Sequence, residues 1–390
     1  MSYNPDILDD ILQTRALSRS QLSERLGVSS DKLNEELNRK PQPKHTLLNK
    51  IARELSVPEF VFYMKNSPTL HDSLPDFRTP QQQATPKSKA TVESIQWAEG
   101  IQRLLSENNG KPLYALPYLS PNLNQKIDDF ALEARQFFGI TPSDQTDAKD
   151  SKAFYLLCRK KIEDHQILVL QDSFPTEDGA GYCIWSPIHP IIVINTQRQR
   201  SSRRLFTLLH ELAHVLMHQS GISDPFISRN SIERLCNRFA ASFLLPRAYL
   251  DVLLRGLEIS NTPTPSEIAR IASRLNISQQ AAILQLERLG QVAKGSHDQW
   301  LSYVQMHGNP DFKKEGGGGN QPPPQEKVKL ARFGFAFANA VSKLIRDARV
   351  TPIDLYRASG LKPKYQNSYL DFVRELSSPV VLRNLELDDD

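Results

Sequence analysis

His210-Glu211-Leu212-Ala213-His214 is an H-E-x-x-H pentapeptide. On a helix, side chains four residues apart share a face, so the two imidazoles can reach the same metal ion. Glu211 projects from the neighbouring position and can hold a water molecule on that ion. This spacing is typical of the zinc centres of hydrolases.

The pentapeptide lies inside an apolar run, residues 205–217, whose side chains make the predicted helix hydrophobic nearly all round. These side chains are Phe206, Leu208, Leu209, Leu212, Ala213, Leu216 and Met217. Such a helix is buried, so packed or solvated histidines on an amphipathic helix are the weaker interpretation. Two histidines and a glutamate inside a buried helix need polar partners, because unpaired buried polar groups are costly. A metal ion supplies those partners.

A third ligand is needed, because catalytic zinc usually takes three protein ligands and leaves one position for water. His218 is eight residues after His210, and eight residues advance a helix by about 12 Å, which is too far to share the ion. The longer pattern H-E-x-x-H-x-x-G-x-x-H also fails, because Met217 and Ser220 occupy its glycine and last histidine positions. A carboxylate on a second helix remains.

Residues 228–245 are predicted to form that second helix, because their apolar side chains repeat at three- and four-residue spacing. Ser231 is expected to cap its start, and Pro246 marks its end. Glu233 lies in the first turn and is the predicted third ligand, while Asn237 follows one turn later, where it can orient a ligand. The alternative for Glu233 is an ordinary first-turn glutamate that the helix dipole favours.

Three blocks of the chain resemble the ImmA/IrrE family of metallopeptidases, and they occur in the family's order. They are residues 190–195 (PIIVIN), 203–214 (RRLFTLLHELAH) and 233–246 (ERLCNRFAASFLLP). The similarity extends over roughly residues 125–250, and Cys236 departs from it at a position where alanine is usual.

This resemblance implies a zincin-like peptidase domain that binds Zn²⁺ through His210, His214 and Glu233, with Glu211 as the catalytic base. Such an enzyme is a zinc metallopeptidase of the HExxH, gluzincin-like type. The resemblance further implies an endopeptidase that hydrolyses a peptide bond in a regulatory protein. That substrate would be a repressor or an antitoxin-like protein, so that cleavage controls transcription.

The expected mechanism follows from zinc chemistry. Zinc lowers the pKa of its bound water towards neutrality and polarises the scissile carbonyl. Glu211 would take the water proton and pass it to the leaving amine. The oxyanion needs a donor besides zinc, and His218, Tyr182 and Tyr249 are candidates between which the sequence does not choose.

The length and composition of the chain limit the number of domains and the kind of protein that it can be. The chain has 390 residues and a formal net charge of +4, so two or three domains are expected. It contains no run of 18 apolar residues, and its polar N-terminus is unlike a signal peptide, so we expect a cytoplasmic protein with no membrane partner. The three cysteines are scattered and odd in number, which argues against a disulfide framework. The sequence does not indicate an oligomeric state.

Residues 1–65 are predicted to form a helix-turn-helix bundle, which resembles the Xre/Cro repressor type. Residues 17–26 and 31–37 have amphipathic spacing, and residues 27–29 form a turn between them. The recognition helix would then span residues 29–38. The candidate DNA-binding residues are Ser29, Ser30, Lys32, Arg39 and Lys40.

The charges of this bundle favour a second interpretation, in which it docks a protein. Residues 1–80 contain eleven acidic and eleven basic side chains, so there is no basic excess. Asp31, Glu35 and Glu36 lie on the predicted recognition helix itself. Carboxylates there oppose DNA binding, because DNA affinity depends largely on neutralising phosphates.

The fold class expected for the whole chain is α+β and mainly helical, with a small β-sheet in the peptidase domain. The strands are predicted at residues 166–170, 182–185 and 190–195. The predicted divisions are a helix-turn-helix bundle (1–65), a linker (66–92), a zincin-like peptidase domain (93–255), a second helix-turn-helix-like helical module (256–308), a flexible linker (309–327) and a C-terminal helical unit (328–390).

Two other functions compete with the peptidase hypothesis. One is a non-catalytic, DNA-binding transcriptional regulator that uses the zinc fold as a sensor or scaffold. The other is the toxin half of a toxin–antitoxin pair, with residues 1–65 acting as its antitoxin-like part.

Overall fold

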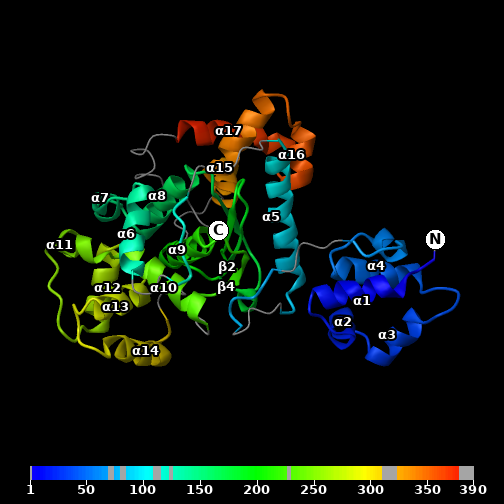
Figure 1. Ribbon diagram of the computed structural model, residues 1–390, viewed down its shortest axis with the longest axis horizontal. Helices are drawn as coiled ribbons and strands as arrows, with labels where there is room; N and C mark the ends of the chain where they lie inside the picture. Colours follow the sequence, from blue (N-terminus) through cyan, green and yellow to red (C-terminus); the bar gives the residue numbers. More distant parts are fainter. Residues whose placement is uncertain are drawn as a thin grey trace.

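The computed structural model describes residues 2–68, 74–79, 85–108, 116–122, 126–225, 230–309 and 323–376. A small mixed sheet lies at its centre among helices, and a group of short helices at the N-terminus stands beside it (Figure 1). No helix within these ranges combines the length and apolar character needed to cross a membrane. Most of the predicted linker 309–327 and the end of the C-terminal unit lie outside the described residues.

Four strands form the sheet in the order β1-β3-β2-β4. They are β1 (Leu168–Asp172), β2 (Gly181–Ile184), β3 (Ile191–Asn195) and β4 (Gly221–Ser223). β1 and β3 run parallel, whereas β2 is antiparallel to its neighbours β3 and β4. The first three strands were predicted to within two residues; β4 was not, because three residues are too few for a visible alternation.

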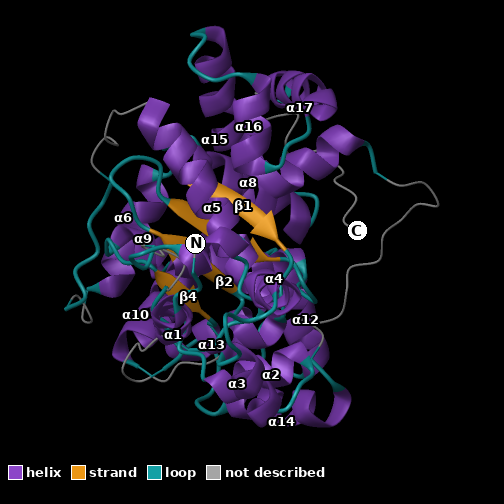
Figure 2. Cartoon of the chain, turned by 90° about the vertical axis from the view of Figure 1, so that its right-hand side faces the viewer, coloured by secondary structure: helices purple, strands orange, loops and turns teal. Residues whose placement is uncertain are grey.

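Helices cover both faces of the sheet (Figure 2). Ile192 and Ile194 of β3 belong to one buried cluster, and Ile191 and Val193 belong to the other. Successive strand side chains point to opposite faces, so a sheet that is buried on both sides needs apolar residues at every position. This explains why residues 190–195 contain a continuous apolar run rather than an alternating one.

The first face carries the helices of the predicted peptidase domain and of the module after it. They are α6 (Ile127–Phe137), α7 (Pro142–Thr146), α8 (Ser151–Glu163), α9 (Ser201–Leu216), α10 (Ser231–Leu244), α11 (Leu250–Leu253), α12 (Pro265–Arg274), α13 (Gln279–Arg288) and α14 (Ser296–His307). Helix α9 packs on β2 and β3, with α8 and α10 on its flanks. The apolar residues of α12–α14 share one buried cluster with α9, so these helices pack on the core around α9.

The second face is covered by α5 (Lys89–Asn108), α15 (Gln325–Arg346), α16 (Pro352–Ser359) and α17 (Pro363–Glu375). The C-terminal helices were expected to form a unit of their own, but α15 packs directly on β1 and its apolar residues join the cluster of this face. Without them β1 would expose Leu168 and Leu170 to solvent. The described C-terminal residues therefore complete the central body.

A buried ion pair positions α15 on the sheet. Glu163 at the end of α8 lies 3.5 Å from Arg159, and its carboxylate accepts a 2.9 Å hydrogen bond from the amide of Phe335. Helix α15 kinks next to that amide, at Gly334, where φ is 75°. A side chain at this position would collide with the Glu163 carboxylate, so only glycine allows the contact. Burial raises the pKa of Glu163 to about 7, against the opposing effect of Arg159.

The N-terminal helices have a separate core of their own. They are α1 (Pro5–Thr14), α2 (Arg19–Leu26), α3 (Ser30–Leu37), α4 (His45–Glu54) and the 3-10 helix η1 (Glu59–Tyr63). Hydrogen bonds connect this group to the region of α5, and one of them runs from the hydroxyl of Ser56 to the carboxylate of Glu93 at 3.2 Å. Arg25 donates to the backbone carbonyl of Lys87 at 2.8 Å, and Gln96 donates to that of Ser56 at 3.1 Å.

Part of the segment 66–92, which was predicted to be a linker, forms secondary structure and packs on the sheet. Helix α5 begins within it, at Lys89, and residues 74–79 pack against the sheet. Asp76 forms a parallel bridge with Ile222 of β4, and Leu74 is buried in the core. The prolines and polar residues of this segment are typical of a linker. This composition does not indicate that the segment pairs with the edge of a strand far away in the sequence.

Candidate metal centre

Helix α9 brings the H-E-x-x-H pentapeptide into the interior. All 16 of its residues are buried, as the apolar run 205–217 predicted. The polar side chains of His210, Glu211 and His214 lie on this buried helix with zero exposed surface. Their positions therefore require partners from neighbouring elements.

Glu233 in the first turn of α10 meets both histidines. Its Oε1 lies 3.0 Å from Nε2 of His214, and its Oε2 lies 3.3 Å from Nε2 of His210. The two Nε2 atoms are 3.3 Å apart. Three side chains from two helices thus point their ligand atoms at one small volume.

These separations fit a tetrahedral metal ion. Zinc binds imidazole nitrogen and carboxylate oxygen at about 2.0–2.1 Å, so two ligand atoms of a tetrahedral site lie roughly 3.3 Å apart. The three measured separations of 3.0–3.3 Å agree with that value. Two imidazole nitrogens that face each other gain at most one hydrogen bond, whereas a cation between them satisfies both lone pairs. His210, His214 and Glu233 are therefore suited to hold a divalent cation.

Asparagines orient this ligand set. The side-chain oxygen of Asn237 lies 2.8 Å from Nδ1 of His210, and its amide nitrogen donates to the carbonyl of Pro225 at 2.7 Å. Asn230, rather than Ser231 as predicted, caps α10, and it accepts a 2.8 Å hydrogen bond from the amide of Glu233. Asn230 thus fixes the start of α10, and Asn237, one turn after Glu233, fixes the ring of His210.

Glu211 lies close enough to the candidate ligands for the charges of His210 and Glu233 to act on it. Ser223 of β4 donates a hydrogen bond to its Oε1. Among the described residues, its buried Oε2 has no hydrogen-bond partner, which is unusual for a carboxylate and indicates a place for water or another ligand. Burial raises the pKa of Glu211 to about 8, an effect that His210 opposes and the negative charge of Glu233 reinforces.

Glu233 has the opposite electrostatic behaviour. Burial alone would raise its pKa, but the charge and hydrogen bonds of His210 and His214 outweigh burial and lower the pKa to about 2. Glu233 is therefore anionic, as a metal ligand must be. Two buried carboxylates with pKa values pushed apart are a common feature of sites that combine binding with proton transfer.

A thiol also approaches the two histidines. Sγ of Cys236, one turn after Glu233, lies within 4.8 Å of their ligand atoms. Burial, followed by the charges of Glu233 and Glu211, raises its pKa well above the usual thiol value. We favour Glu233 as the third ligand, because it contacts both imidazoles directly and is already ionised, whereas the thiol would have to lose a proton.

Phe77 is a neighbour of the centre that the sequence did not indicate. Its ring stacks on His214, with centroids 4.3 Å apart and planes 5° apart. It comes from the segment that was predicted as a linker. No spacing rule connects residue 77 with residue 214, so only the tertiary structure could bring them together.

The three candidates for an oxyanion donor have their contacts away from the ligand atoms, and for Tyr182 the donor itself is engaged. His218 stacks on Trp185 at 3.9 Å. The hydroxyl of Tyr182 lies 3.0 Å from that of Ser94, in the cluster on the sheet face opposite α9. The ring of Tyr249 packs under the guanidinium of Arg135. None of these contacts directs a donor towards the ligand atoms.

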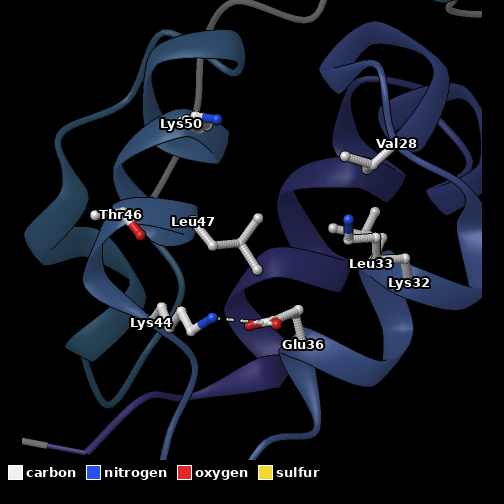
Figure 3. A pocket seen from close by; sticks show the side chains of 8 residues that line it. All are labelled: Val28, Lys32, Leu33, Glu36, Lys44, Thr46, Leu47 and Lys50. Atoms are coloured by element: carbon white, nitrogen blue, oxygen red, sulfur yellow. Dashed lines mark hydrogen bonds and ion pairs between the residues drawn. The ribbon is translucent and has the colours of Figure 1, made fainter.

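The predicted DNA-binding residues lie around the start and end of α3. Ser29 caps the helix, and Ser30 shares a 2.9 Å hydrogen bond with Ser23. Arg39 lies 3.7 Å from Glu36, and Lys40 precedes Pro41. Lys32 lines a hollow of about 180 Å³ between α3 and α4, together with Lys44, Lys50 and Glu36 (Figure 3). The 3.4 Å ion pair between Lys44 and Glu36 crosses that hollow.

Comparison with known proteins points to a metallopeptidase. Residues 162–287 match a peptidase family described as the IrrE N-terminal-like domain. The chain is also similar to the radiation response metalloprotease IrrE of Deinococcus deserti, with 34% identity over 117 residues. That match covers 28% of this chain and 38% of the relative, so the chain spans less than half of the relative's length. These similarities support the ImmA/IrrE family, and a metallopeptidase, for this part of the chain.

Proposed function

We propose that this protein is a zinc-dependent endopeptidase that hydrolyses one peptide bond in a regulatory protein. The observation that carries the proposal is the meeting of His210, His214 and Glu233 at separations of 3.0–3.3 Å beside the buried carboxylate of Glu211. Three candidate ligands with a carboxylate beside them support a catalytic rather than a structural zinc site, because a catalytic site leaves one position for water.

His210, His214 and Glu233 would hold the ion. When bound, zinc supplies a Lewis acid that lowers the pKa of a water molecule and polarises the scissile carbonyl. Glu211 accepts the proton of the attacking water at Oε2, the oxygen that has no hydrogen-bond partner among the described residues. It then returns this proton to the nitrogen of the leaving amine.

Contacts with neighbouring residues prepare Glu211 to act as the base. Ser223 holds Oε1, so the carboxylate keeps one orientation while Oε2 handles the proton. Without a cation, burial raises the pKa of Glu211 to about 8. A neighbouring divalent charge lowers the pKa of a carboxyl group, which favours the basic form at neutral pH.

The proposed substrate is a repressor or an antitoxin-like regulator. Support comes from the family match and from the relative, whose name describes a metalloprotease of a radiation response. The mixed sheet also ends at β4, a strand of three residues beside the centre, and its edge pairs with an extended segment, residues 75–77, as it would with an extended substrate.

The decisive experiment compares wild-type protein with Glu211→Gln. Metal analysis of both should give one zinc per chain, because Gln leaves the three ligands in place. Cleavage of a repressor-like protein from the same genome, followed by mass spectrometry, should fall by a factor of about 10² or more in the variant. Equal cleavage by the two proteins would refute the proposed mechanism.

A second candidate function is DNA binding by residues 1–65. The observation in its favour is the hollow between α3 and α4, whose lining includes Lys32, Lys44 and Lys50 and one carboxylate, that of Glu36. A gel shift at two salt concentrations tests it. Binding that weakens steeply with salt supports phosphate contacts, and no binding at low salt removes this candidate.

A further inference from the structure

The ring of Phe77 lies beside the proposed metal ligands. It stacks on His214 on one side and lies over Gly221 of β4 on the other. A Cβ atom at Gly221 would collide with this ring, and its three nearest atoms all belong to Phe77. Glycine at position 221 thus makes room for an aromatic side chain next to the centre.

The backbone around Phe77 pairs with the edge of the sheet. The amide of Phe77 donates to the carbonyl of Ile222 at 2.9 Å, and the amide of Ile222 donates to the carbonyl of Pro75 at 2.8 Å. These are the hydrogen-bonding groups that an edge strand offers to an incoming extended peptide. Residues 74–79 therefore use the edge of β4 that a substrate would need.

Side chains hold this segment at the centre. Asn230, the cap of α10, donates from its amide nitrogen to the carbonyl of Phe77. Arg78 pairs with Asp76 at 2.6 Å, and Lys87 donates to the carbonyl of Leu74 at 3.0 Å. Asn230 also accepts a hydrogen bond from the amide of Glu233, so one residue contacts both the segment and the start of the ligand helix.

In this arrangement the four key side chains have no exposed surface. His210, Glu211, His214 and Glu233 are all completely buried, and Phe77 itself is 2% exposed. A polypeptide substrate has to bring its scissile carbonyl to the ligand atoms, and this requires an opening on the sheet side of the centre. The structure therefore shows a closed state of the proposed active site.

We propose that residues 74–79 form an intramolecular cover that occupies the substrate edge of β4, with Phe77 as its plug on His214. This inference rests on the proposed peptidase function and adds an inhibited state to it. The cover leaves the edge before a substrate pairs with Ile222. Hydrolysis is then limited by the fraction of molecules in which the cover has opened.

The test measures access to the metal rather than hydrolysis. The full-length protein is loaded with Co²⁺, and its visible spectrum is titrated with acetohydroxamate, a small chelating probe. Phe77→Ala removes the plug, and Gly221→Ala displaces it while leaving the ring in the chain. Both variants should bind the probe about tenfold more tightly than wild type, because a larger fraction of molecules is open.

Phe337→Ala is the matched control, since it removes a fully buried ring from α15, which packs on the opposite edge strand β1. Its probe affinity should equal that of wild type, and thermal unfolding of all four proteins checks that they fold. If Phe77→Ala and Gly221→Ala both bind the probe with the affinity of wild type, the proposal that residues 74–79 cover the site is wrong. Weaker binding of the probe to both variants also contradicts the proposal, because Phe77 would then contribute to the binding site instead of blocking it.

The same proteins separate this inference from the proposed function. If the two variants admit the probe more readily but cleave no protein, the cover stands and the peptidase proposal fails. If wild type cleaves its substrate in a Glu211-dependent way while probe affinity is unchanged in the variants, the peptidase stands and the cover fails. Failure to bind Co²⁺ at all overturns both.

Discussion

The side-chain oxygen of Asn237 lies 2.8 Å from Nδ1 of His210. Because the amide nitrogen of Asn237 donates to the carbonyl of Pro225, the amide cannot rotate without losing that bond, and its oxygen faces the ring. An accepting oxygen keeps the proton on Nδ1 and leaves the lone pair on Nε2. This contact would orient His210 for its proposed role as a metal ligand before any ion binds.

Replacing Asn237 with Ala should weaken metal binding by a factor of about 10–100, because partners of ligating histidines contribute this much to affinity. Competition with a chromophoric zinc chelator measures the affinity. Arg234→Ala is the control, since Arg234 is an exposed residue on the same helix. Equal zinc affinities in the two variants would contradict the orienting role.

Zinc should stabilise the folded protein. An ion at about one hundred times its Kd adds about 2.7 kcal/mol to the free energy of unfolding, provided that it binds only the folded state. Thermal unfolding with zinc and with a chelator measures the difference. His214→Ala should abolish the shift, whereas His307→Ala, which removes an exposed histidine of α14, should keep it. A zinc-dependent shift that survives in His214→Ala would place the ion elsewhere.

Gly334→Ala should destabilise the protein by about 3–5 kcal/mol, the usual cost of breaking a buried ion pair. The new methyl group would displace the Glu163 carboxylate from Arg159, in addition to the strain of a positive φ. Gly139→Ala is matched, because φ there is 66° but nothing lies within 4 Å of the added atom. It should cost only about 1 kcal/mol. Chemical denaturation compares the two, and equal losses would rule out the clash.

Asp128 should make stability depend on pH in the acid range. Arg288 lies 2.7 Å from its carboxylate and Arg238 lies 3.3 Å away. Burial raises its pKa, but Arg288, Ser242 and Arg238 outweigh burial and lower it from 3.8 to about 2. Because the folded pKa is lower than the unfolded one, the contribution is complete above pH 3.8 and is lost as the pH falls towards 2.

Unfolding free energies of wild type and Asp128→Asn, measured between pH 5 and the acid limit of folding, test this dependence. The wild type should lose more stability than the variant as the pH falls. The difference should be small, since the carboxylate is 37% exposed and solvent screens it. Parallel curves for the two proteins would show that Asp128 contributes nothing to the pH dependence.

Local patterns were sufficient for much of the site. The four-residue spacing of His210 and His214 and the apolar surroundings of the pentapeptide predicted a buried helix with both imidazoles on one face, as α9 has. The apolar period of residues 228–245 predicted α10 and put Glu233 in its first turn. These features follow from helix geometry alone, so they can be read along the chain.

Three of the errors share one cause. Strand β4 is too short to show alternation, and residues 74–79 have the composition of a linker although they pair with it. The C-terminal helices were separated from the body, but they cover β1 through the kink at Gly334. Each of these three errors concerns a contact between segments that lie far apart along the chain, whereas the cap of α10, predicted at Ser231 and found at Asn230, is a local error.

The sequence by itself therefore determined which side chains can act together on one helix face, because a helix fixes the distance between residues three and four apart. Only the tertiary structure decided what surrounds them. Ser223 reaches Glu211 and Phe77 stacks on His214, and each contact arises because a distant segment packs against the same buried helix. Such contacts depend on how whole layers fit together, and no local pattern encodes them.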